Sequence, residues 1–339
     1  MKDGGQRPPE TRLPRRHLLG WGAAGAASLA CPAVLRAQAP MRLRLAHALP
    51  TTHPVHAAME GMVAEIEART GGGVRIALFA NGELGDEIEL MENTRAGAID
   101  VTKLSASVVE RVAPIYRAFN LPFLFRDRAH LHHVVGSGIG QGFLEAGAAT
   151  GLVGLTFYDA GSRSFYAQRP IDHPDDLKGL RIRVQLSPTM SRMIALYEAQ
   201  AVPLPWHVVY SALQTGLVDG AENSVAALIV GRHGEVARYY CFDEHTMIPD
   251  VLMISAKRWV ELSADQREIF REAAARSFAR MVDLWTAFEA ESMERAHSMG
   301  IAFTRPDKRP FAQRVAPIRQ NFADDPAVLD LITRIEQVA

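Results

Sequence analysis

The 339-residue sequence is poor in cysteine. Its two cysteines are Cys31 and Cys241. Because Cys31 falls in a segment that we interpret below as a removed leader, the mature chain keeps one thiol and can form no intrachain disulfide. The fold must therefore be stabilised by burial of apolar surface, and we interpret Cys241 as a small buried hydrophobic residue.

An excess of basic charge is also missing. The chain has 37 basic and 38 acidic residues, and the first 39 residues hold six of the basic and two of the acidic ones. Residues 40–339 therefore keep 31 basic and 36 acidic residues. A mildly acidic body does not have the basic patch that nucleic acids and anionic membrane surfaces require. We expect neither as a partner.

Motifs of common enzyme classes are absent as well. The sequence has no G-x-S-x-G elbow and no phosphate-binding G-x-x-x-x-G-K-[ST] loop. A glycine-rich segment at residues 136–142 follows a helical pattern rather than a strand, and Gln141 takes the place of the third glycine of a dinucleotide loop. We interpret this segment as a turn and expect no cofactor.

Histidines occur in two pairs with helical spacing. His130 and His133 are three residues apart, as are His53 and His56, so each pair shares one helix face. Neither pair has a cysteine or carboxylate grouped with it at metal-ligand spacing. We expect solvated helix faces rather than metal sites.

The apolar segment at residues 21–35 is too short to span a bilayer, which takes about 20 residues. A charged start, a short apolar run and a small-residue exit are typical of a secretory leader. The paired Arg15 and Arg16 resemble the twin-arginine class, which exports folded proteins. We predict a twin-arginine signal peptide over residues 1–39 and a soluble, periplasmic mature chain. An ordinary Sec leader is the alternative.

The cleavage site of this leader is less well defined by the sequence. Residues 37–39 read Ala-Gln-Ala and fit a small-x-small exit, but Pro40 follows directly. Residues 28–31 resemble a lipoprotein box in which Ser28 replaces the usual leucine. Cleavage after residue 39 is the prediction, and lipid anchoring is the alternative.

Strand and helix patterns alternate after the leader. The period-2 and 3.6-residue patterns predict a strand, a helix, a strand, a helix and a strand in turn. These segments are Arg42–Ala48, a helix that starts at Pro54, Val74–Phe79, Glu83–Arg95 and Ile99–Leu104. A βαβαβ order implies a parallel sheet with helices on its faces.

A second unit begins near Gly161. Its predicted segments are a strand at Leu180–Val184, helices at Pro188–Gln200 and Tyr210–Thr215, a strand at Val251–Ser255 and a long helix that starts at the capping box Ser263–Gln266. We therefore expect two α/β lobes with a ligand cleft between them.

Two arginines lie on one face of the strand at residues 180–184. Alternation places Arg181 and Arg183 together, with Ile182 on the opposite face. The planar fork of an arginine at a strand end matches a carboxylate and can form two parallel charge-assisted hydrogen bonds. Pairing of these arginines with surface acids is the alternative.

Several motifs occur together in a recognisable order. They are Ala46-His47-Ala48-Leu49 with Pro54, Asn81-Gly82-Glu83-Leu84-Gly85, Gly97-Ala98-Ile99-Asp100, Leu121-Pro122-Phe123-Leu124-Phe125, Lys178-Gly179-Leu180-Arg181-Ile182-Arg183-Val184, Ala212-Leu213-Gln214-Thr215-Gly216 and Asp219-Gly220-Ala221-Glu222-Asn223. In these motifs the chain resembles the solute-binding subunit of tripartite ATP-independent periplasmic (TRAP) transporters over essentially its whole mature length.

The resemblance implies a two-lobed fold of the type II periplasmic binding protein kind. It also implies that the late strand at residues 251–255 returns to the first lobe. We expect lobe I to hold residues 40–160 and 247–290, and lobe II residues 161–246 and 291–339.

The resemblance further implies a set of ligand contacts. Arg183 matches the arginine that clamps the substrate carboxylate, and Arg163 and Asn223 match its helpers. Trp206 matches an aromatic position of the pocket, and Tyr210 follows one helical turn later. On the first lobe the matching positions are His47, Glu87 and Ser105.

The chain departs from this family at a few positions. Val208 stands where many relatives carry glutamate, and Asp243-Glu244-His245 replaces a Thr-Asn-His segment. Some relatives bind 2-oxo acids through a cation and carry tryptophan at the position of Asn223. The asparagine favours direct recognition of the carboxylate, so we expect no resident metal.

The function predicted from the resemblance is capture of a small organic acid and its delivery to TRAP membrane subunits by a monomeric, non-enzymatic protein. A sensory binding protein that presents the same ligand to a receptor is one alternative. A periplasmic enzyme is the other, and the missing cofactor motifs count against it.

Overall fold

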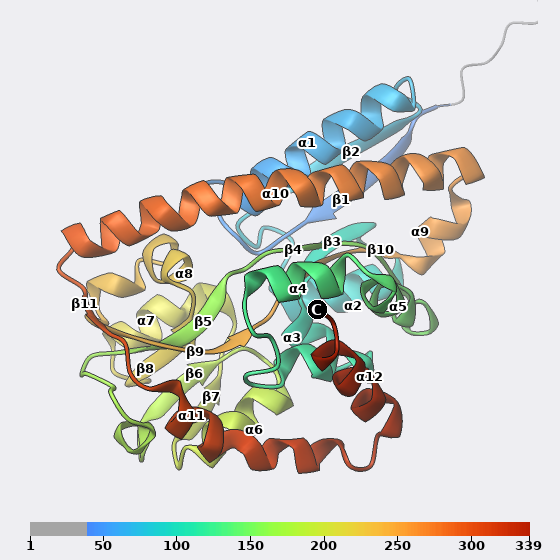
Figure 1. Ribbon diagram of the computed structural model, residues 1–339. Helices are drawn as coiled ribbons and strands as arrows, with labels where there is room; N and C mark the ends of the chain where they lie inside the picture. The colour runs from blue at the N-terminus through green and yellow to red at the C-terminus, as the bar shows by residue number, and fades with distance from the viewer. Residues whose placement is uncertain (1–38) are drawn as a thin grey trace, which may run out of the picture. The chain divides into compact units, whose positions relative to one another are not determined.

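The computed structural model describes residues 39–339, which form two β-sheets covered by helices (Figure 1). The predicted α/β class is confirmed. The predicted leader, with Arg15, Arg16 and Cys31, lies outside the described residues. In the described part of the chain, no helix combines the length and the hydrophobicity that crossing a bilayer requires.

The first sheet has the strand order β2-β1-β3-β10-β4. β1 pairs in parallel with β2 and β3, as the βαβαβ pattern predicts. β10 lies between β3 and β4 and is antiparallel to both, so the late strand joins the early ones. The strands are β1 (Met41–Ala46), β2 (Val74–Phe79), β3 (Val101–Ser105), β4 (Leu152–Tyr158) and β10 (Asp250–Ser255).

The helices around this sheet begin where the sequence supplies caps. His53 caps α1 by accepting a hydrogen bond from the backbone N–H of Val55. α2 begins at Glu87 rather than at the predicted Glu83, because Asp86 forms a capping box with Glu89. The helical segments are α1 (Pro54–Arg69), α2 (Glu87–Ala96), α3 (Ala106–Val109), η1 (Pro114–Asn120), α4 (Arg128–Val135), α5 (Gly138–Ala146), η2 (Ala148–Thr150) and α9 (Ala256–Glu261).

The second sheet has the strand order β11-β9-β5-β8-β6-β7. β5 is antiparallel to β8 and β9, whereas β6 is parallel to β7 and β8. The strands are β5 (Ser162–Ala167), β6 (Arg181–Val184), β7 (Gln200–Pro203), β8 (Gly220–Asn223), β9 (Tyr239–Met247) and β11 (Ala302–Thr304).

The helices near the second sheet are mostly short. α6 ends at Leu196, earlier than predicted, because Gln200 already pairs with Arg181 in the sheet. The segments near this sheet are η3 (Pro174–Leu177), α6 (Pro188–Leu196), η4 (Trp206–Val208), α7 (Val209–Gln214), α8 (Val225–Val230), η5 (His233–Glu235) and α11 (Lys308–Val315). The chain ends with η6 (Ala316–Phe322) and α12 (Pro326–Glu336).

The chain passes between the two sheets more than once. β4 leads into β5 through residues 159–161, and β9 leads into β10 through residues 248–249. The long helix α10 (Ala264–Ser298) packs against α1 and β4 and also against α8, so it extends along both sheets (Figure 1). Its predicted capping box at Ser263–Gln266 is present. These connections place the ends of several strands from both sheets around one cavity.

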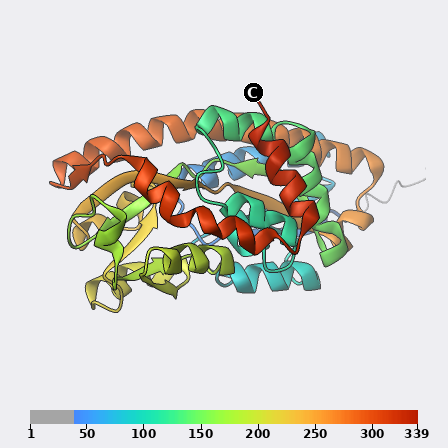
Figure 2. The same ribbon diagram turned by 60° about the horizontal axis from the view of Figure 1, so that its bottom comes forward.

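The C-terminal segment does not follow a simple division of the chain. α11 packs near β9, whereas α12 packs against η1, and the red ribbon runs from one to the other in Figures 1 and 2. Arg126, near the start of α4, donates hydrogen bonds to the carbonyls of Glu336 and Val338. The lobe boundaries remain a prediction. α12 belongs to residues 291–339, which we assign to lobe II, but it packs against η1, which lies within the range that we assign to lobe I.

The predicted solvated histidine faces are wrong for two of the four residues. His130 is buried, and its Nε2 lies 2.9 Å from the carbonyl oxygen of Ile335 in α12. His53 is buried as the cap of α1. The ring of His130 contacts α12 and the ring of His53 lies near Trp285 of α10. Residue spacing within a single helix cannot predict such contacts with other helices. Cys241 is buried, as predicted.

Candidate functional site

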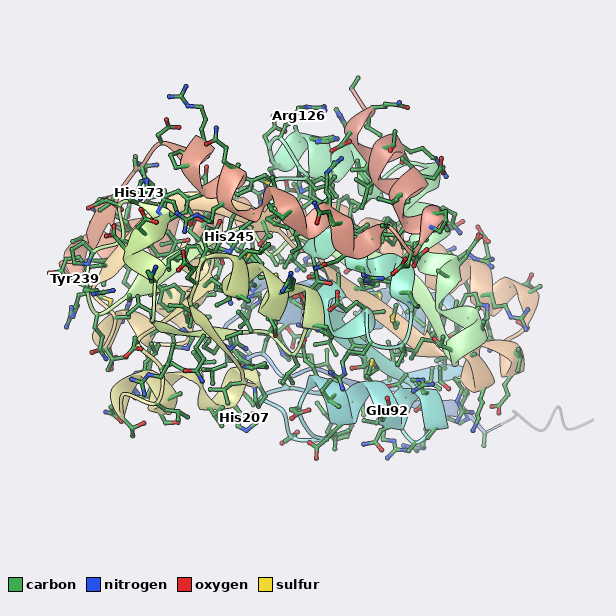
Figure 3. All side chains as sticks on the ribbon, turned by 90° about the horizontal axis from the view of Figure 1, so that it is seen from below. Glu92, Arg126, His173, His207, Tyr239 and His245 are labelled. Carbon is green, nitrogen blue, oxygen red and sulfur yellow. The ribbon has the colours of Figure 1, made fainter. Side chains whose placement is uncertain are left out.

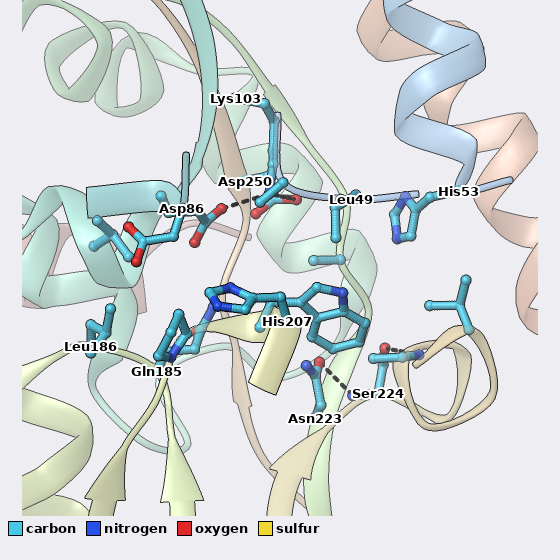
Figure 4. A pocket seen from close by; sticks show the side chains of 18 of the residues that line it. Leu49, His53, Asp86, Lys103, Gln185, Leu186, His207, Asn223, Ser224 and Asp250 are labelled. Atoms are coloured by element: carbon cyan, nitrogen blue, oxygen red, sulfur yellow. Dashed lines mark hydrogen bonds and ion pairs between the residues drawn. The ribbon is translucent and has the colours of Figure 1, made fainter. Parts of the chain in front are cut away.

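A cavity of about 80 Å³ lies where β1, β3, β6 and β8 end, between elements of the two sheets. Several water-sized spheres of roughly 10–15 Å³ each fit this volume, so it suits a small polar solute. Figure 4 shows Lys103 and Asp250 on one side of it and Asn223 and Ser224 on the other. Pockets outside the carboxyl ends of strands are the usual ligand sites of α/β folds.

Arg183 projects from β6 into this cavity. Its neighbours Ile182 and Val184 are fully buried on the opposite face of the strand, which fixes the direction of the arginine. Nε and Nη2 of Arg183 donate to the carbonyl oxygen of Leu204 at 3.0 and 2.6 Å. Nη1 is buried and has no partner among residues 39–339. Burial lowers the pKa of this guanidinium, as expected for a cation without a counterion.

Arg181, two residues earlier, takes a different role. Its Nη2 and Nε donate to Asp219 at 2.6 and 3.0 Å, and its side chain is 41% exposed. The alternative of pairing with a surface acid therefore holds for Arg181 and not for Arg183. Of the two arginines, only Arg183 lines the cavity.

Arg163 of β5 also lines the cavity, but its donors are largely occupied. Its Nε and Nη2 bind the two carboxylate oxygens of Glu222 at 2.6 and 2.8 Å, and its Nη1 donates to Asn223 Oδ1 at 3.0 Å. Burial opposes the charge of Arg163, and Glu222 outweighs burial and raises the pKa. Arg163 therefore orients Asn223, because its guanidinium donors are already bound to Glu222 and Asn223 rather than available to a ligand.

A buried histidine completes the network behind Arg163. Nδ1 of His245 lies 2.7 Å from Asp243, and its Nε2 lies 3.6 Å from Glu222. Burial alone would lower the pKa of His245, but Asp243 and Glu222 raise it to about 9. For the acid Glu222 the directions are reversed: burial alone would raise its pKa, but Arg163 and His245 lower it to about 2. At neutral pH these groups form a charged, hydrogen-bonded support for the cavity wall.

Asn223 ends β8 with a fixed amide orientation. Its Oδ1 accepts hydrogen bonds from Nη1 of Arg163 and from the backbone N–H of Ser224 at 2.9 Å. The Nδ2 group is therefore the part of the amide left to donate to a ligand. Trp206 lines the same wall and supplies an aromatic surface.

The opposite wall carries a compact ionic cluster. Nζ of Lys103 lies 2.8 Å from Glu87 Oε1 and 3.1 Å from Asp250 Oδ2. Burial opposes the charge of Lys103, but the two carboxylates outweigh it and raise the pKa of the lysine above its ordinary value. Burial raises the pKa of Asp250 to about 6, although Lys103 acts in the opposite direction.

His53 and Trp285 close the cavity near α10. Their rings lie 5.7 Å apart, and both residues are buried. Burial lowers the pKa of His53 to about 3, and Lys103 adds to this effect, so the imidazole is neutral. His207 lines the cavity and is exposed (Figure 3), so the cavity opens to solvent near this residue.

The cavity brings together five of the eight residues predicted from the sequence, namely Arg183, Arg163, Asn223, Trp206 and Glu87. The other three lie elsewhere. Tyr210 donates its hydroxyl hydrogen to Glu235 at 3.1 Å and lies outside the cavity lining.

His47 and Ser105 lie behind the cavity wall rather than in it. His47 is fully buried, and its Nε2 lies 3.0 Å from Nδ1 of His56. Ser105 caps α3, and its backbone N–H donates to Glu87 Oε1 at 3.1 Å. In the structure both residues support contacts of the wall.

Some lining residues were missed by the sequence prediction, among them Lys103, Asp250, His53 and Gln185. Lys103 is a single charge within a strand whose other residues are buried, and Asp250 directly precedes five fully buried strand residues. A charge in such a position needs a partner. That signal could have identified both residues, but not their contact across sequence-distant strands.

Residues 39–339 contain no group of three histidine, cysteine, aspartate or glutamate side chains arranged to hold a metal ion. The cavity instead offers donors at Arg183, Lys103 and Asn223 and acceptors at Glu87 and Asp250. This set fits a hydrogen-bonding anion with further polar groups.

The chain is similar to known solute-binding proteins in sequence and in structure. The family model of bacterial extracellular solute-binding proteins, family 7, matches residues 45–325. A solute-binding protein of Chromohalobacter salexigens is 31% identical over 290 residues, which cover 85% of this chain and 86% of the relative.

Two solved structures are similar over 88% of this chain, each with a TM-score of 0.86. One is a TRAP periplasmic solute-binding protein from Xanthobacter autotrophicus Py2 with bound β-D-galacturonate, which is 38% identical and fully covered. The other is a TRAP periplasmic solute-binding protein from Anaerococcus prevotii with bound D-glucuronate, which is 32% identical and 98% covered.

Proposed function

We propose that this chain, which belongs to family 7 of the bacterial extracellular solute-binding proteins, captures a hexuronate. Family membership makes it the solute-binding subunit that delivers a small carboxylate to the membrane subunits of a TRAP transporter. Proteins of this family work in the periplasm. The proposal concerns the identity of the acid and the residues that bind it.

The observation that carries the proposal is the unpaired Nη1 of Arg183. A buried cationic donor without a partner costs several kcal/mol, so the site is complete only when an anion binds there. A carboxylate offers two acceptor oxygens to Arg183. Because Oδ1 of Asn223 is occupied by Arg163 and Ser224, its Nδ2 is left to donate to the ligand. Arg163 acts mainly by holding Asn223.

The part of the ligand beyond its carboxylate is a sugar ring with hydroxyl groups, and both similar structures and the cavity lining support this. Two structures at 38% and 32% identity hold D-galacturonate and D-glucuronate. Trp206 supplies an aromatic face of the kind that packs on sugar rings, and the opposite wall supplies Lys103, Glu87 and Asp250 to hydroxyl groups. A six-carbon sugar acid has a ring face that can pack on Trp206 and hydroxyl groups that can bind to the opposite wall.

Three further points belong to this proposal. The chain acts as a binding protein without catalysis, as expected of a family of solute-binding proteins. The carboxylate binds without a bridging cation. Export follows the twin-arginine route through Arg15 and Arg16, so replacement of both by lysine is expected to abolish periplasmic accumulation.

Titration calorimetry with D-galacturonate and D-glucuronate tests the ligand. The matched controls are D-galactose and D-glucose, which keep the ring hydroxyls and have no carboxylate. We expect saturable binding of at least one uronate and no measurable binding of the neutral sugars. Equal binding of sugar and sugar acid would show that the carboxylate is not the recognised group.

A further inference from the structure

The two walls of the cavity carry opposite charge. The wall formed by the first sheet and its helices is lined by three carboxylates, those of Asp86, Glu87 and Asp250, and by one ammonium group, that of Lys103. This wall therefore has two negative charges in excess. The ammonium group of Lys103 lies 3.1 Å from Asp250 Oδ2 and favours the charged form of this carboxylate. Across the cavity, Arg183 supplies a positive charge without a counterion.

The geometry of the cluster leaves defined groups for a ligand. Lys103 binds Oε1 of Glu87 and Oδ2 of Asp250, so one oxygen of each carboxylate is engaged by the lysine. The other oxygen of each can accept a hydrogen bond from a ligand. Lys103 has three N–H donors, two of which point to these carboxylates, which leaves one for a ligand oxygen.

A hydroxyl group matches this arrangement better than a carboxylate does. A hydroxyl donates one hydrogen bond and accepts others, so it can donate to Glu87 or Asp250 while it accepts from Lys103. An ionised carboxylate only accepts, and next to Glu87 and Asp250, whose side chains are 17% and 9% exposed, it meets charges of its own sign with little water to screen them. Like charges that cannot be separated or hydrated are strongly disfavoured.

We propose that Glu87, Lys103 and Asp250 form a hydroxyl-recognition subsite that rejects a second carboxylate. The protein thereby distinguishes monoanionic sugar acids from dicarboxylic acids, including those that differ from a hexuronate only by oxidation at C1. This inference rests on the proposed hexuronate function, in which Arg183 holds the single carboxylate. It adds the residues that set specificity at the other end of the ligand.

The test compares D-galacturonate with galactarate, in which C1 is also a carboxylate, by titration calorimetry at pH 7.5. For the wild type we expect galacturonate to bind at least 100-fold more tightly. Galactarate is an open chain, so shape contributes to this ratio as well as charge. The variants Glu87→Gln and Asp250→Asn separate the two contributions, because each removes one negative charge and keeps the side-chain shape.

Each variant is expected to reduce the galacturonate-to-galactarate affinity ratio by at least tenfold, mainly through tighter binding of galactarate. Glu198→Gln is the control, since Glu198 is exposed and pairs with Lys178 away from the cavity. Circular dichroism establishes whether each variant is folded. If Asp250→Asn does not fold, Glu87→Gln alone is sufficient for the test.

Two results would overturn the inference while hexuronate binding stands. The first is wild-type binding of galactarate as tight as that of galacturonate. The second is a wild-type preference that both variants retain unchanged, which would assign the selectivity to shape. If neither acid nor D-glucuronate binds, the proposed function itself fails.

Discussion

The guanidinium of Arg183 is held by a single backbone carbonyl, that of Leu204. Nε and Nη2 both donate to this oxygen, at 3.0 and 2.6 Å, and Nη1 has no partner among residues 39–339. Leu204 follows β7, the neighbour of β6 in the sheet, so the fold itself sets the direction of the clamp. A neutral carbonyl orients the cation and leaves its charge for the ligand.

Asn223 offers a prediction about donor direction. Because its Oδ1 is used by Arg163 and Ser224, we expect Asn223→Ala to weaken hexuronate binding by about 1–2 kcal/mol, the value of a neutral donor to an anion. Asn223→Asp keeps the contact with Arg163 but replaces the donor by an oxygen that repels the carboxylate. Calorimetry should show a larger loss for aspartate than for alanine, and the reverse order would place the amide nitrogen away from the ligand.

Tyr210 was predicted to line the pocket, and the structure places it against Glu235 and beneath the guanidinium of Arg232, 5.4 Å from the ring centre. Tyr210→Phe removes the hydroxyl and keeps the ring. We expect uronate affinity within about twofold of wild type and a change in unfolding free energy below about 1 kcal/mol, since a surface hydrogen bond contributes little. A tenfold loss of affinity would return Tyr210 to the site.

Gly161, in the connection from β4 to β5, has a φ of +73°, and a Cβ atom there would lie 2.9 Å from the Trp285 ring. Gly161→Ala is therefore expected to lower the free energy of unfolding by about 1–3 kcal/mol. Gly142→Ala is the control: Gly142 lies in α5 with open space around it, so alanine should stabilise by about 0.5–1 kcal/mol. Urea unfolding of both variants measures this, and equal effects would contradict the account.

The ionic network behind Arg163 predicts a pH dependence of stability. The pKa of His245 is about 9 in the folded protein against 6.5 for the free side chain, so the folded state holds the proton more tightly. This contribution is complete below pH 6.5 and is lost as the pH rises through 9. The melting temperature should fall over this window by roughly a few degrees, and His245→Gln should flatten the fall. A wild-type profile that is flat from pH 6.5 to 9 would show that His245 is not charged in the fold.

The alternation of strand and helix patterns predicted the α/β class and the parallel start of the first sheet, whereas the return of the late strand to that sheet was implied by the family resemblance. The βαβαβ start, the cap before Pro54 and the capping box at Ser263–Gln266 are local signals, and local hydrogen bonding places those elements where the sequence suggests. The predicted ends of helices and strands were less accurate where a contact with a distant part of the chain determines them. Gln200 joins β7 rather than α6 because Arg181 offers it a place in the sheet.

The site was predictable where a residue's direction follows from its strand. Arg183 could be placed by alternation, but its difference from Arg181 depends on Asp219, which lies 38 residues further along the chain. Lys103 and Asp250 come from adjacent strands that are 147 positions apart in sequence. No pattern in the sequence identifies such a pair. A single charge within a buried strand indicates only that it has a partner, not which residue the partner is.

The measurement that tests the account most directly is calorimetry of D-galacturonate and D-glucuronate with substitutions at Arg183. Loss of one partner of a desolvated charge pair predicts that Arg183→Ala weakens binding by about 2–5 kcal/mol, and Arg183→Lys by less, because lysine keeps the charge without the planar fork. Arg181→Ala, on the same strand and paired with Asp219, is the matched control and should leave affinity nearly unchanged. Near wild-type affinity in folded Arg183→Ala would contradict the account and move the clamp elsewhere, with Arg163 as the first candidate.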